Sequence, residues 1–541
     1  MQSQLLAIYA LQDAVEQLQQ ADRKDELAAT INSNIENILN LAFNINEQIQ
    51  DSNQDLLCTC LDILYSLFEI DASTTSIYSE KVTEFICLLL KTNKSDPLMA
   101  DSVICLLDKL ICIENGADKV VEKLTPTLVE ILTDTEDQDA LTLKCTAIEV
   151  FEHLAKEIRK AEKTGKSISE NFFKQATDAL FIPMMSVGLE SDYSTDTQII
   201  ENITTTCKAI FQGKYGVDIM CNGKDGNGKS YLEYVLQFVS VVLDPEAAEE
   251  GATSIGKLVT TMVAKCGNQL QEQDILKQLL QACLHKLQKC QTISVQQSLL
   301  LVFGQLMCEN LTAVLDFLNS VDATTFVFKL FVEKYNDFFG YMERKIGAIA
   351  LSNLLKYLIE NREDAKYSSL LMLNVNGEQI INNTQGDGKR MTRSKAAKAG
   401  PVEFKQIPLI VKLYKNLLSE CQMQIDRQNN KFNETLDHDD NSEDDEWVED
   451  DENIDPDSQP SNGLGLEGKN MTADEFLDGG CAFIEDDEDF FDEFEKADNP
   501  FGEVEICEHV FGVMKSVPFN VELKQEFSED ELRCAVDMGL C

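Results

Sequence analysis

The sequence predicts an all-α fold, a solenoid in which antiparallel helix pairs stack into a superhelical array. Apolar residues recur at helical spacing in stretch after stretch up to about residue 360, and strand-like alternation is almost missing from the pattern. Predicted helices begin near residues 54, 97 and 138, so the repeat is about 40 residues long, the period of HEAT repeats. One pair cannot cover its own apolar faces, and stacking buries them. An irregular helical bundle is the alternative.

The stretch that begins at Pro97 illustrates the pattern. Its apolar stripe contains Met99, Val103, Leu106 and Leu110, and Asp96 and Pro97 supply a helix cap and a first-turn proline. Asp244-Pro245 marks a turn, and Pro126, Pro183 and Pro408 each precede an apolar run that they could open or bend. The other predicted helices cover 54–70, 76–92, 117–133, 138–162, 169–189, 194–212, 229–243, 253–266, 272–289, 293–308 and 340–360.

The first residues have the pattern of a helix from the middle of such an array. Leu5, Ile8, Leu11 and Val15 form an apolar stripe in the stretch 4–18. A solenoid normally begins with a capping repeat that has a polar outer face. We therefore expect a further N-terminal portion to belong with this chain.

Five regions follow from the composition. Residues 1–372 are the predicted solenoid, 373–403 a polar and basic loop, and 404–428 a further helix of the array. Residues 429–502 are an acidic, aromatic-containing loop that we expect to be largely disordered, and 503–541 carry the C-terminal helices, near 503–516 and 528–538.

The acidic loop holds much of the charge of the chain. Residues 432–498 contain 27 Asp and Glu and two lysines, a net charge of -25, whereas the whole chain has a net charge of -48. Such a segment repels itself and buries too little apolar surface to offset the entropy of ordering. Trp447 and several phenylalanines lie among the acids, so short-range anchoring of a basic partner is favoured over a purely solubilising role.

Bulk composition excludes several classes of protein. A strongly acidic chain is a poor partner for nucleic acid or an anionic membrane, because both are polyanions. The 17 cysteines fall mostly in apolar helical patterns, which indicates buried thiols in a reducing compartment. There is no signal-peptide pattern, and no uninterrupted apolar run reaches the roughly 18 residues of a membrane span.

One stretch matches a phosphate-binding loop by sequence. Residues 223–230 fit the pattern G-x-x-x-x-G-K-[ST], with Lys229 and Ser230 in the positions that would contact phosphate and magnesium. A true loop follows a buried strand in a parallel sheet and precedes a helix. Here a predicted helix follows, but residues 217–221 before the loop are only a short apolar patch, and no βαβ series is present to make the sheet. We interpret the stretch as an inter-helix loop.

No catalytic, cofactor or metal site is predicted. Cys58-Thr59-Cys60 lacks a nearby second pair of ligands, and Cys507 with His509 fits a surface or core role better. The basic run that begins at Lys389 and ends at Lys398 has four open interpretations: a nuclear import signal, a contact for an acidic surface, a segment that folds back onto the chain's own acidic loop, or a solvated loop.

Several stretches resemble the importin-beta (karyopherin) family of nuclear transport receptors. They are residues 234–245, 293–303, 392–395, 406–412 and 445–447 together with the acid-rich loop. The resemblance implies a non-enzymatic, monomeric receptor without cofactors that shuttles between cytoplasm and nucleus through the pore. It also implies nucleoporins and basic cargo, such as core histones and ribosomal proteins, as partners. In the family Ran-GTP is recognised mainly by N-terminal repeats, so the resemblance leaves Ran binding by this sequence in doubt.

The expected cargo-contacting residues lie in the acidic loop; they are Glu443, Asp444, Asp445, Glu446, Trp447, Glu449, Asp450, Asp451 and Glu452. Two other functions stay open. One is a HEAT scaffold or histone chaperone that does not act in transport, and the other is a nucleotide hydrolase that uses Lys229.

Overall fold

The structure is a computed structural model of the 541-residue chain. The residues that it describes are 10–12, 14, 15, 17, 34–47, 54–70, 72–92, 97–113, 116–134, 140–163, 170–191, 196–271, 274–361, 368–371, 373–379, 404–437, 506–516 and 525–540. They divide into two compact units, Met1–Val302 and Phe303–Cys541.

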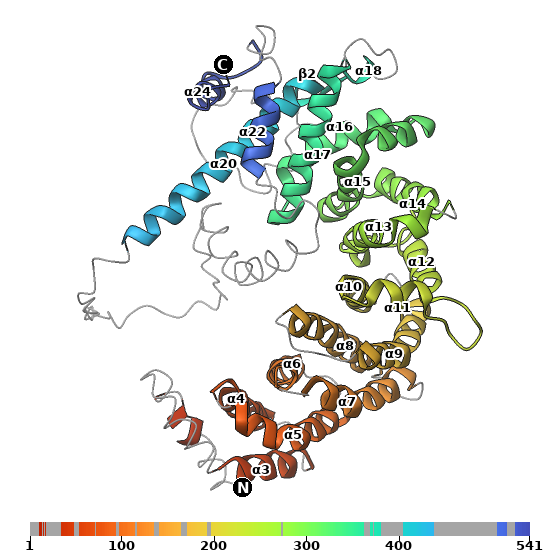
Figure 1. The fold of residues 1–541 in the computed structure, drawn as a ribbon, viewed down its shortest axis with the longest axis vertical. Coiled ribbons are helices and arrows are strands. Elements are labelled where there is room, and N and C mark those ends of the chain that lie inside the picture. Colours follow the sequence, from red (N-terminus) through yellow and green to blue (C-terminus); the bar gives the residue numbers. More distant parts are fainter. Residues whose placement is uncertain are drawn as a thin grey trace, which may run out of the picture. The chain divides into compact units, whose positions relative to one another are not determined.

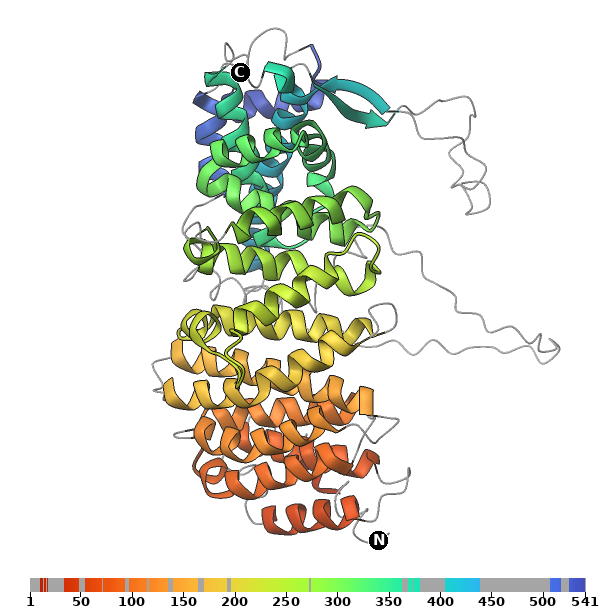
Figure 2. The same ribbon diagram turned by 90° about the vertical axis from the view of Figure 1, so that its right-hand side faces the viewer.

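The first unit is a stack of paired helices (Figures 1 and 2). Its elements are α3 (Ile35–Glu47), α4 (Gln54–Ile70), α5 (Ala72–Thr92), α6 (Pro97–Ile111), α7 (Gly116–Thr133), α8 (Ala140–Lys163), α9 (Glu170–Glu190), α10 (Thr197–Gln212), α11 (Gly216–Asn222), α12 (Tyr231–Val242), the 3-10 turn Glu250–Ala252, α13 (Ile255–Gln271), α14 (Ile275–Lys289) and the first part of α15 (Ile293–Ser320).

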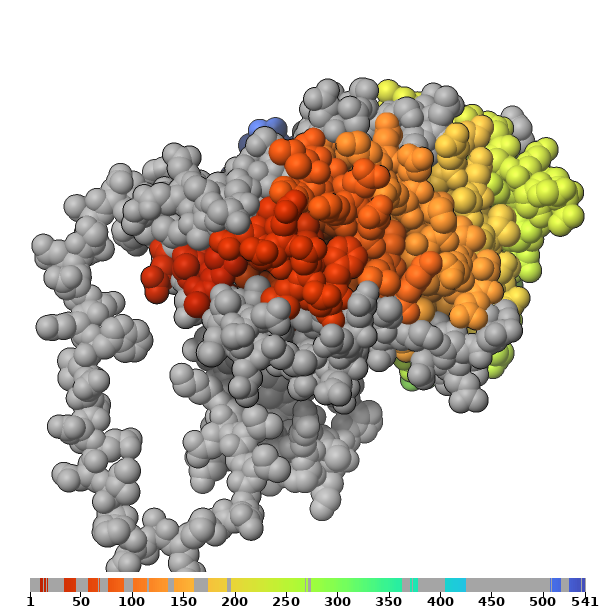
Figure 3. All heavy atoms as spheres, turned by 90° about the horizontal axis from the view of Figure 1, so that it is seen from below, coloured from red at the N-terminus to blue at the C-terminus, as the bar shows by residue number. Residues whose placement is uncertain are grey.

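The stack has two layers. Helices α4, α6, α8, α10 and α13 pack in succession on one side, and α3, α5, α7, α9 and α12 pack in succession on the other. Apolar side chains such as Leu64, Phe85, Leu106 and Leu128 are fully buried between the layers. Seen from its N-terminal end in Figure 3, the described part of this unit is a close-packed surface. The predicted array of paired helices is confirmed.

The second unit is also mainly helical. It contains α16 (Thr324–Lys334), the 3-10 turn Tyr335–Asp337, α17 (Tyr341–Glu360), α18 (Ser368–Leu371), α20 (Leu409–Asp437), α22 (Ile506–Ser516) and α24 (Glu529–Asp537). Two strands, β1 (Asn374–Gln379) and β2 (Phe404–Pro408), form an antiparallel pair. Helix α20 packs against α16, α17 and α22, so it is the central element of this unit.

Two local predictions were wrong at the start of α20. Residues 404–408 are a strand rather than the beginning of a helix, and residues 374–379 are a strand rather than linker. The physical reason is Pro408, because a proline disfavours the helical conformation in the residue before it and favours an extended one. Ile407 is therefore free to pair with Val375, and both side chains are buried.

Helix boundaries follow the proline signals in part. Helix α6 begins at Pro97 as expected, although Asp96 lies outside the described residues, and the backbone N–H of Glu246 donates to the Asp244 carboxylate in the expected turn. Pro126 and Pro183 lie inside α7 and α9, not at their starts. Helix α16 and the second half of α15 lie beyond the predicted ranges.

One described helix, α15, is long and apolar enough to cross a membrane by length and composition alone. Of its most apolar 18-residue window, 61% is buried inside the protein. Asn310 interrupts its helical geometry, with φ -152° and ψ 80°. Burial of this kind is what a core helix of a stacked array requires.

Candidate functional site

The residues expected to contact cargo, from Glu443 to Glu452, lie outside the described part of the chain, as does the basic run 389–398. The structure does describe the helices on either side of the acidic loop. Helix α20 ends at Asp437, α22 begins at Ile506, and the two helices pack together. The Tyr414 hydroxyl donates to the Met514 carbonyl at 3.4 Å, which adds a polar contact between them. Both attachment points of the acidic loop therefore belong to one packed unit.

A second acidic region emerges from the packing of the first unit. Asp62 on α4, Asp101 and Asp108 on α6, and Glu149 and Glu152 on α8 lie in the layer formed by α4, α6 and α8. We call these five residues the acidic face. Asp62, Asp101 and Asp108 all act electrostatically on Cys105, and Asp101 and Glu152 both act on Glu149, so the five carboxylates form one neighbourhood.

The opposite layer has a different charge arrangement. Lys123 on α7 pairs with Glu80 at 2.9 Å and with Glu84 at 2.5 Å, and Lys91 pairs with Glu130 at 2.5 Å. These three glutamates are therefore paired with lysines within the protein. On the acidic face, His153 is hydrogen-bonded to Asp108, and Lys156 pairs with Glu152 at 2.8 Å.

The electrostatic cost of this arrangement shows at Glu149. Burial raises the pKa of its carboxyl group above the usual range, and the nearby carboxylates of Asp101 and Glu152 raise it further. Partial burial likewise raises the pKa of Asp62. A surface that holds carboxylates against their own repulsion is stabilised when a cationic group approaches it. The acidic face is thus suited to binding a basic partner.

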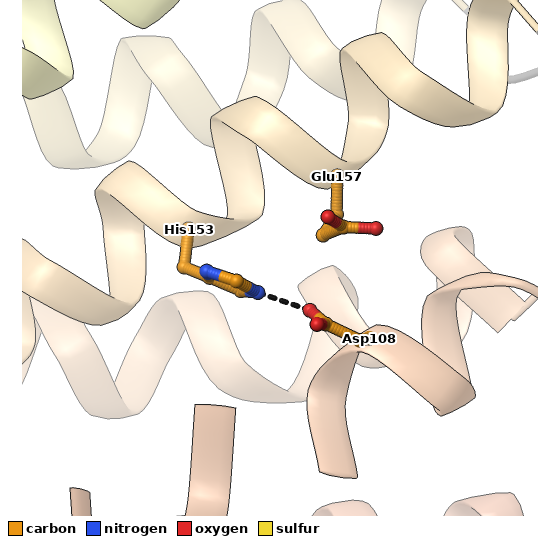
Figure 4. Close-up of side chains that lie close together, drawn as sticks. All are labelled: Asp108, His153 and Glu157. Atoms are coloured by element: carbon orange, nitrogen blue, oxygen red, sulfur yellow. Dashed lines mark hydrogen bonds and ion pairs between the residues drawn. The ribbon is translucent and has the colours of Figure 1, made fainter. Parts of the chain in front are cut away.

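Asp108, His153 and Glu157 form the most compact group of polar side chains in this region (Figure 4). His153 and Glu157 lie one turn apart on α8, and the His153 ring nitrogen Nε2 is hydrogen-bonded to the Asp108 carboxylate on α6. One ligand atom from each of the three lies within 4.8 Å of the others, so the group has the composition of a metal site. A cation bound to both His153 and Asp108 would have to open their direct hydrogen bond. The arrangement fits a hydrogen bond that joins α6 to α8 better than a metal centre.

The stretch 223–230 is an inter-helix loop, as expected. It follows helix α11, and Gly228 has a φ of +87° where the chain turns back toward α12. The Asp225 carboxylate accepts hydrogen bonds from the backbone N–H groups of Asn227 at 2.9 Å and Lys229 at 2.8 Å. In a phosphate loop such N–H groups face the ligand. Here a carboxylate occupies that position, and it would repel a phosphate.

The two side chains expected to bind nucleotide have other partners. Lys229 Nζ donates to Gln237 at 2.6 Å and lies 3.7 Å from the centre of the Tyr234 ring. Ser230 caps α12 in a capping box with Glu233. These contacts leave neither group directed at a ligand, so the phosphate-loop pattern is a coincidence of sequence.

Of the remaining candidate ligands, only Cys60 is shown to be a core residue. Cys60 is buried and Cys58 is half-buried, and burial, with a smaller effect of Asp62, raises the pKa of the Cys60 thiol to about 12. A thiol of this kind resists the deprotonation that metal binding requires. Burial lowers the pKa of His509, and the side chain of Cys507 lies outside the described residues.

Reasoning from the sequence missed the acidic face, although a signal exists. Asp101 and Asp108 are seven residues apart, and Glu149 and Glu152 are three apart, spacings that place each pair on one side of a helix. What the sequence could not supply is that α4, α6 and α8 share a layer.

Comparison with known proteins adds sequence relatives. Residues 11–106 match the Xpo1 family, described as Exportin 1-like protein. The chain is 25% identical over 387 residues to Importin-9 of Drosophila melanogaster, a match that covers 69% of this chain and 35% of that protein. It is 28% identical over 195 residues to Importin subunit beta-5 of Saccharomyces cerevisiae, which covers 35% of this chain and 18% of that protein.

A solved structure, that of Kap121p bound to Nup53p, is similar at 11% identity and a TM-score of 0.36 over 99% of this chain and 57% of that chain. The matched part of this chain spans about a third of the length of Importin-9 and about a fifth of the length of Importin subunit beta-5. Both of these relatives are named as importins. By sequence, the chain is therefore similar to importins over part of the length of each.

Proposed function

We propose that the protein is a nuclear transport receptor that binds basic protein cargo, carries it between cytoplasm and nucleus and shields it from polyanions. The similarity to two importins carries this proposal. The charge supports it, since a net charge of -48 favours partners such as core histones and ribosomal proteins. Within this proposal the chain corresponds to the C-terminal half of Importin-9, acts as a monomer and contacts nucleoporins during passage.

Two acidic regions, one in each unit, are proposed to contact basic cargo independently. The acidic loop, with Asp444, Asp445 and Trp447, supplies a dense charge on the second unit. The acidic face supplies carboxylates held on packed helices of the first unit. Fixed carboxylates lose little conformational entropy on binding, whereas the loop supplies many charges at low specificity. Salt should weaken both contributions.

Charge-neutralising variants test this proposal with a matched control. Asp62→Asn, Asp101→Asn and Glu149→Gln together remove three negative charges from the acidic face. Glu80→Gln, Glu84→Gln and Glu130→Gln remove three from the opposite layer, where lysines already pair with them. We expect the first set to weaken binding of a core histone dimer by about tenfold at physiological salt, and the second by about twofold or less.

The measurement is a titration of the labelled histone dimer at several salt concentrations. Equal losses for the two triple variants would show that only net charge matters and would remove the acidic face from the proposal. A chain that binds no basic protein at low salt would remove the cargo proposal itself.

Transport is separated from the alternative of a HEAT scaffold or non-transporting histone chaperone by a different assay. In permeabilised cells a transport receptor accelerates the entry of a fluorescent basic cargo into nuclei. A scaffold or chaperone binds the same cargo without accelerating its entry. Ran-GTP is included in one arm, since cargo release on its addition would extend the proposal to Ran binding.

A further inference from the structure

Two cysteines of the first unit lie in direct contact although 45 residues separate them in sequence. The sulfur atoms of Cys221 on α11 and Cys266 on α13 are 3.8 Å apart. Among the cysteines that the structure describes, these two have their sulfur atoms in contact with each other. The short helix α11 ends one residue after Cys221, and α12 lies between the two cysteines in sequence.

The local backbone favours the pairing. Cys266 has φ -118° and ψ 15°, a non-helical conformation that kinks α13 at this residue. Kinks of this kind release a residue from the regular path of the helix. Cys266 is fully buried, while Cys221 is half-buried and retains access to solvent. The Cys221 thiol is therefore accessible to a small oxidant, whereas the Cys266 thiol is shielded from solvent.

The two thiols are also chemically unequal. The hydrogen-bonding contact between the two sulfur atoms lowers the pKa of Cys221 below the usual range of a thiol, against the opposing effects of burial and Asp218. The same contact raises the pKa of Cys266, and burial raises it further. Cys221 is thus the thiol that more readily forms a nucleophilic thiolate, whereas Cys266 stays protonated.

We propose that Cys221 and Cys266 form a redox-sensitive pair that closes to a disulfide when the protein meets a peroxide. The Cys221 thiolate attacks one peroxide oxygen, the O–O bond breaks, and Cys221 becomes a sulfenic acid while the other oxygen leaves and takes up a proton as water. The Cys266 sulfur then attacks the Cys221 sulfur, the S–O bond breaks, and the oxygen leaves with the Cys266 proton as water. The two thiols are oxidised by two electrons and the peroxide is reduced.

The geometry requires only a small movement. A disulfide is about 2.05 Å long, so the sulfur atoms must approach by about 1.8 Å from their contact distance. The bond would tie α11 to α13 across α12, so consecutive helix pairs of the stack could no longer shift relative to each other at this point. This inference is independent of the proposed transport function.

Mass spectrometry of the full chain tests the pair without any variant. Trypsin cleaves after Lys214, Lys224, Lys265 and Lys277, so Cys221 and Cys266 fall in the separate peptides 215–224 and 266–277. After treatment with hydrogen peroxide and alkylation of the remaining thiols, we expect these peptides linked as the dominant disulfide. Dithiothreitol should reverse the link. Recovery of both peptides unlinked, under peroxide that oxidises the exposed Cys105, would overturn the proposal.

Variants add a second readout. Oxidation of the wild type should raise the midpoint of thermal unfolding by about 5 °C, because the disulfide closes a loop of 45 residues in the unfolded chain. Cys266→Ala should abolish that rise and leave a Cys221 sulfenic acid that reacts with dimedone, whereas Cys105→Ser should retain the rise. A rise that persists in Cys266→Ala would assign the effect to another pair and contradict the proposal.

Discussion

Glu149 lies on α8 among charges of its own sign, and this position makes its ionisation unfavourable for folding. Burial and the carboxylates of Asp101 and Glu152 raise its pKa in the folded chain above the unfolded value. The folded chain therefore binds this proton more tightly than the unfolded chain does. The contribution of the Glu149 carboxyl group to the free energy of unfolding therefore falls as pH rises through its unfolded-state pKa and then its folded-state pKa, and it stays low at neutral pH.

The substitution Glu149→Gln should remove this cost. We expect a higher midpoint of thermal unfolding at pH 7 and a much smaller difference at pH 4, where the wild-type carboxyl group is largely protonated. Glu130→Gln is the control, because the Glu130 carboxylate pairs with Lys91 and its loss should be neutral or slightly destabilising. A variant of Glu149 that melts earlier than wild type at pH 7 would mean that its carboxylate stabilises the fold.

The loop at 223–230 shows how one residue sets the start of an element. Ser230 accepts a hydrogen bond from the backbone N–H of Glu233, and the Glu233 side chain accepts one from the backbone N–H of Ser230. The reciprocal pair satisfies donors that a helix start would otherwise leave open. Helix α12 therefore begins at Tyr231.

Ser230→Ala should destabilise the first unit by about 1 kcal/mol through loss of this cap. Lys229→Ala is the matched neighbour, since its contacts with Gln237 and Tyr234 are exposed and its effect should be about half as large or less. Chemical denaturation measures both. Neither variant should change binding of ATP or GTP, because we expect no binding by the wild type. Nucleotide binding that depends on Lys229 would revive the hydrolase alternative.

Helix α20 is fixed in the second unit by a buried charge network. The Glu420 carboxylate accepts hydrogen bonds from Tyr335 at 2.8 Å and from Arg344 at 2.7 and 3.1 Å, and Glu420 is fully buried. Asn416, one turn earlier, donates to the Val332 carbonyl at 2.8 Å. Together they join α20 to α16, α17 and the turn between those helices. The position from which the acidic loop departs depends on this network.

Glu420→Gln should destabilise the second unit by about 3 kcal/mol, because it leaves the mostly buried Arg344 without its charge partner. Asp337→Asn serves as a control of similar chemistry, since the Asp337–Lys334 pair is largely exposed and should contribute about 1 kcal/mol or less. Urea denaturation monitored by circular dichroism distinguishes the two. Similar midpoints for both variants would show that Glu420 is not held in a buried pair.

At the scale of the whole molecule, the proposed function predicts that the acidic loop and the acidic face make separable contributions to binding. Replacing residues 439–495 with a neutral Gly/Ser segment of equal length should weaken binding of a histone dimer and flatten its salt dependence, because a dense cluster of carboxylates is lost. Unchanged affinity across several salt concentrations would refute the role of the loop. Trp447→Ala tests the aromatic part alone, which should reduce affinity without changing the salt slope.

The sequence by itself determined the architecture of helix pairs, because apolar spacing and proline positions are local signals. Such local signals predicted the start of α6 at Pro97, the turn at Asp244 and the C-terminal helices. The strand pair was missed, because a 24-residue segment separates β1 from β2 in sequence, and no local pattern reports the pairing of Val375 with Ile407. The cargo-contacting residues from Glu443 to Glu452 stay a prediction.

Tertiary structure decided which residues meet. The acidic face exists because α4, α6 and α8 share a layer, the Cys221–Cys266 contact spans 45 residues, and the Arg344–Glu420 pair spans 76. Helical periodicity states which side of a helix a residue occupies, but not which helix lies opposite. That choice is made by the packing of apolar faces, and it brings the polar groups between them into contact as a consequence.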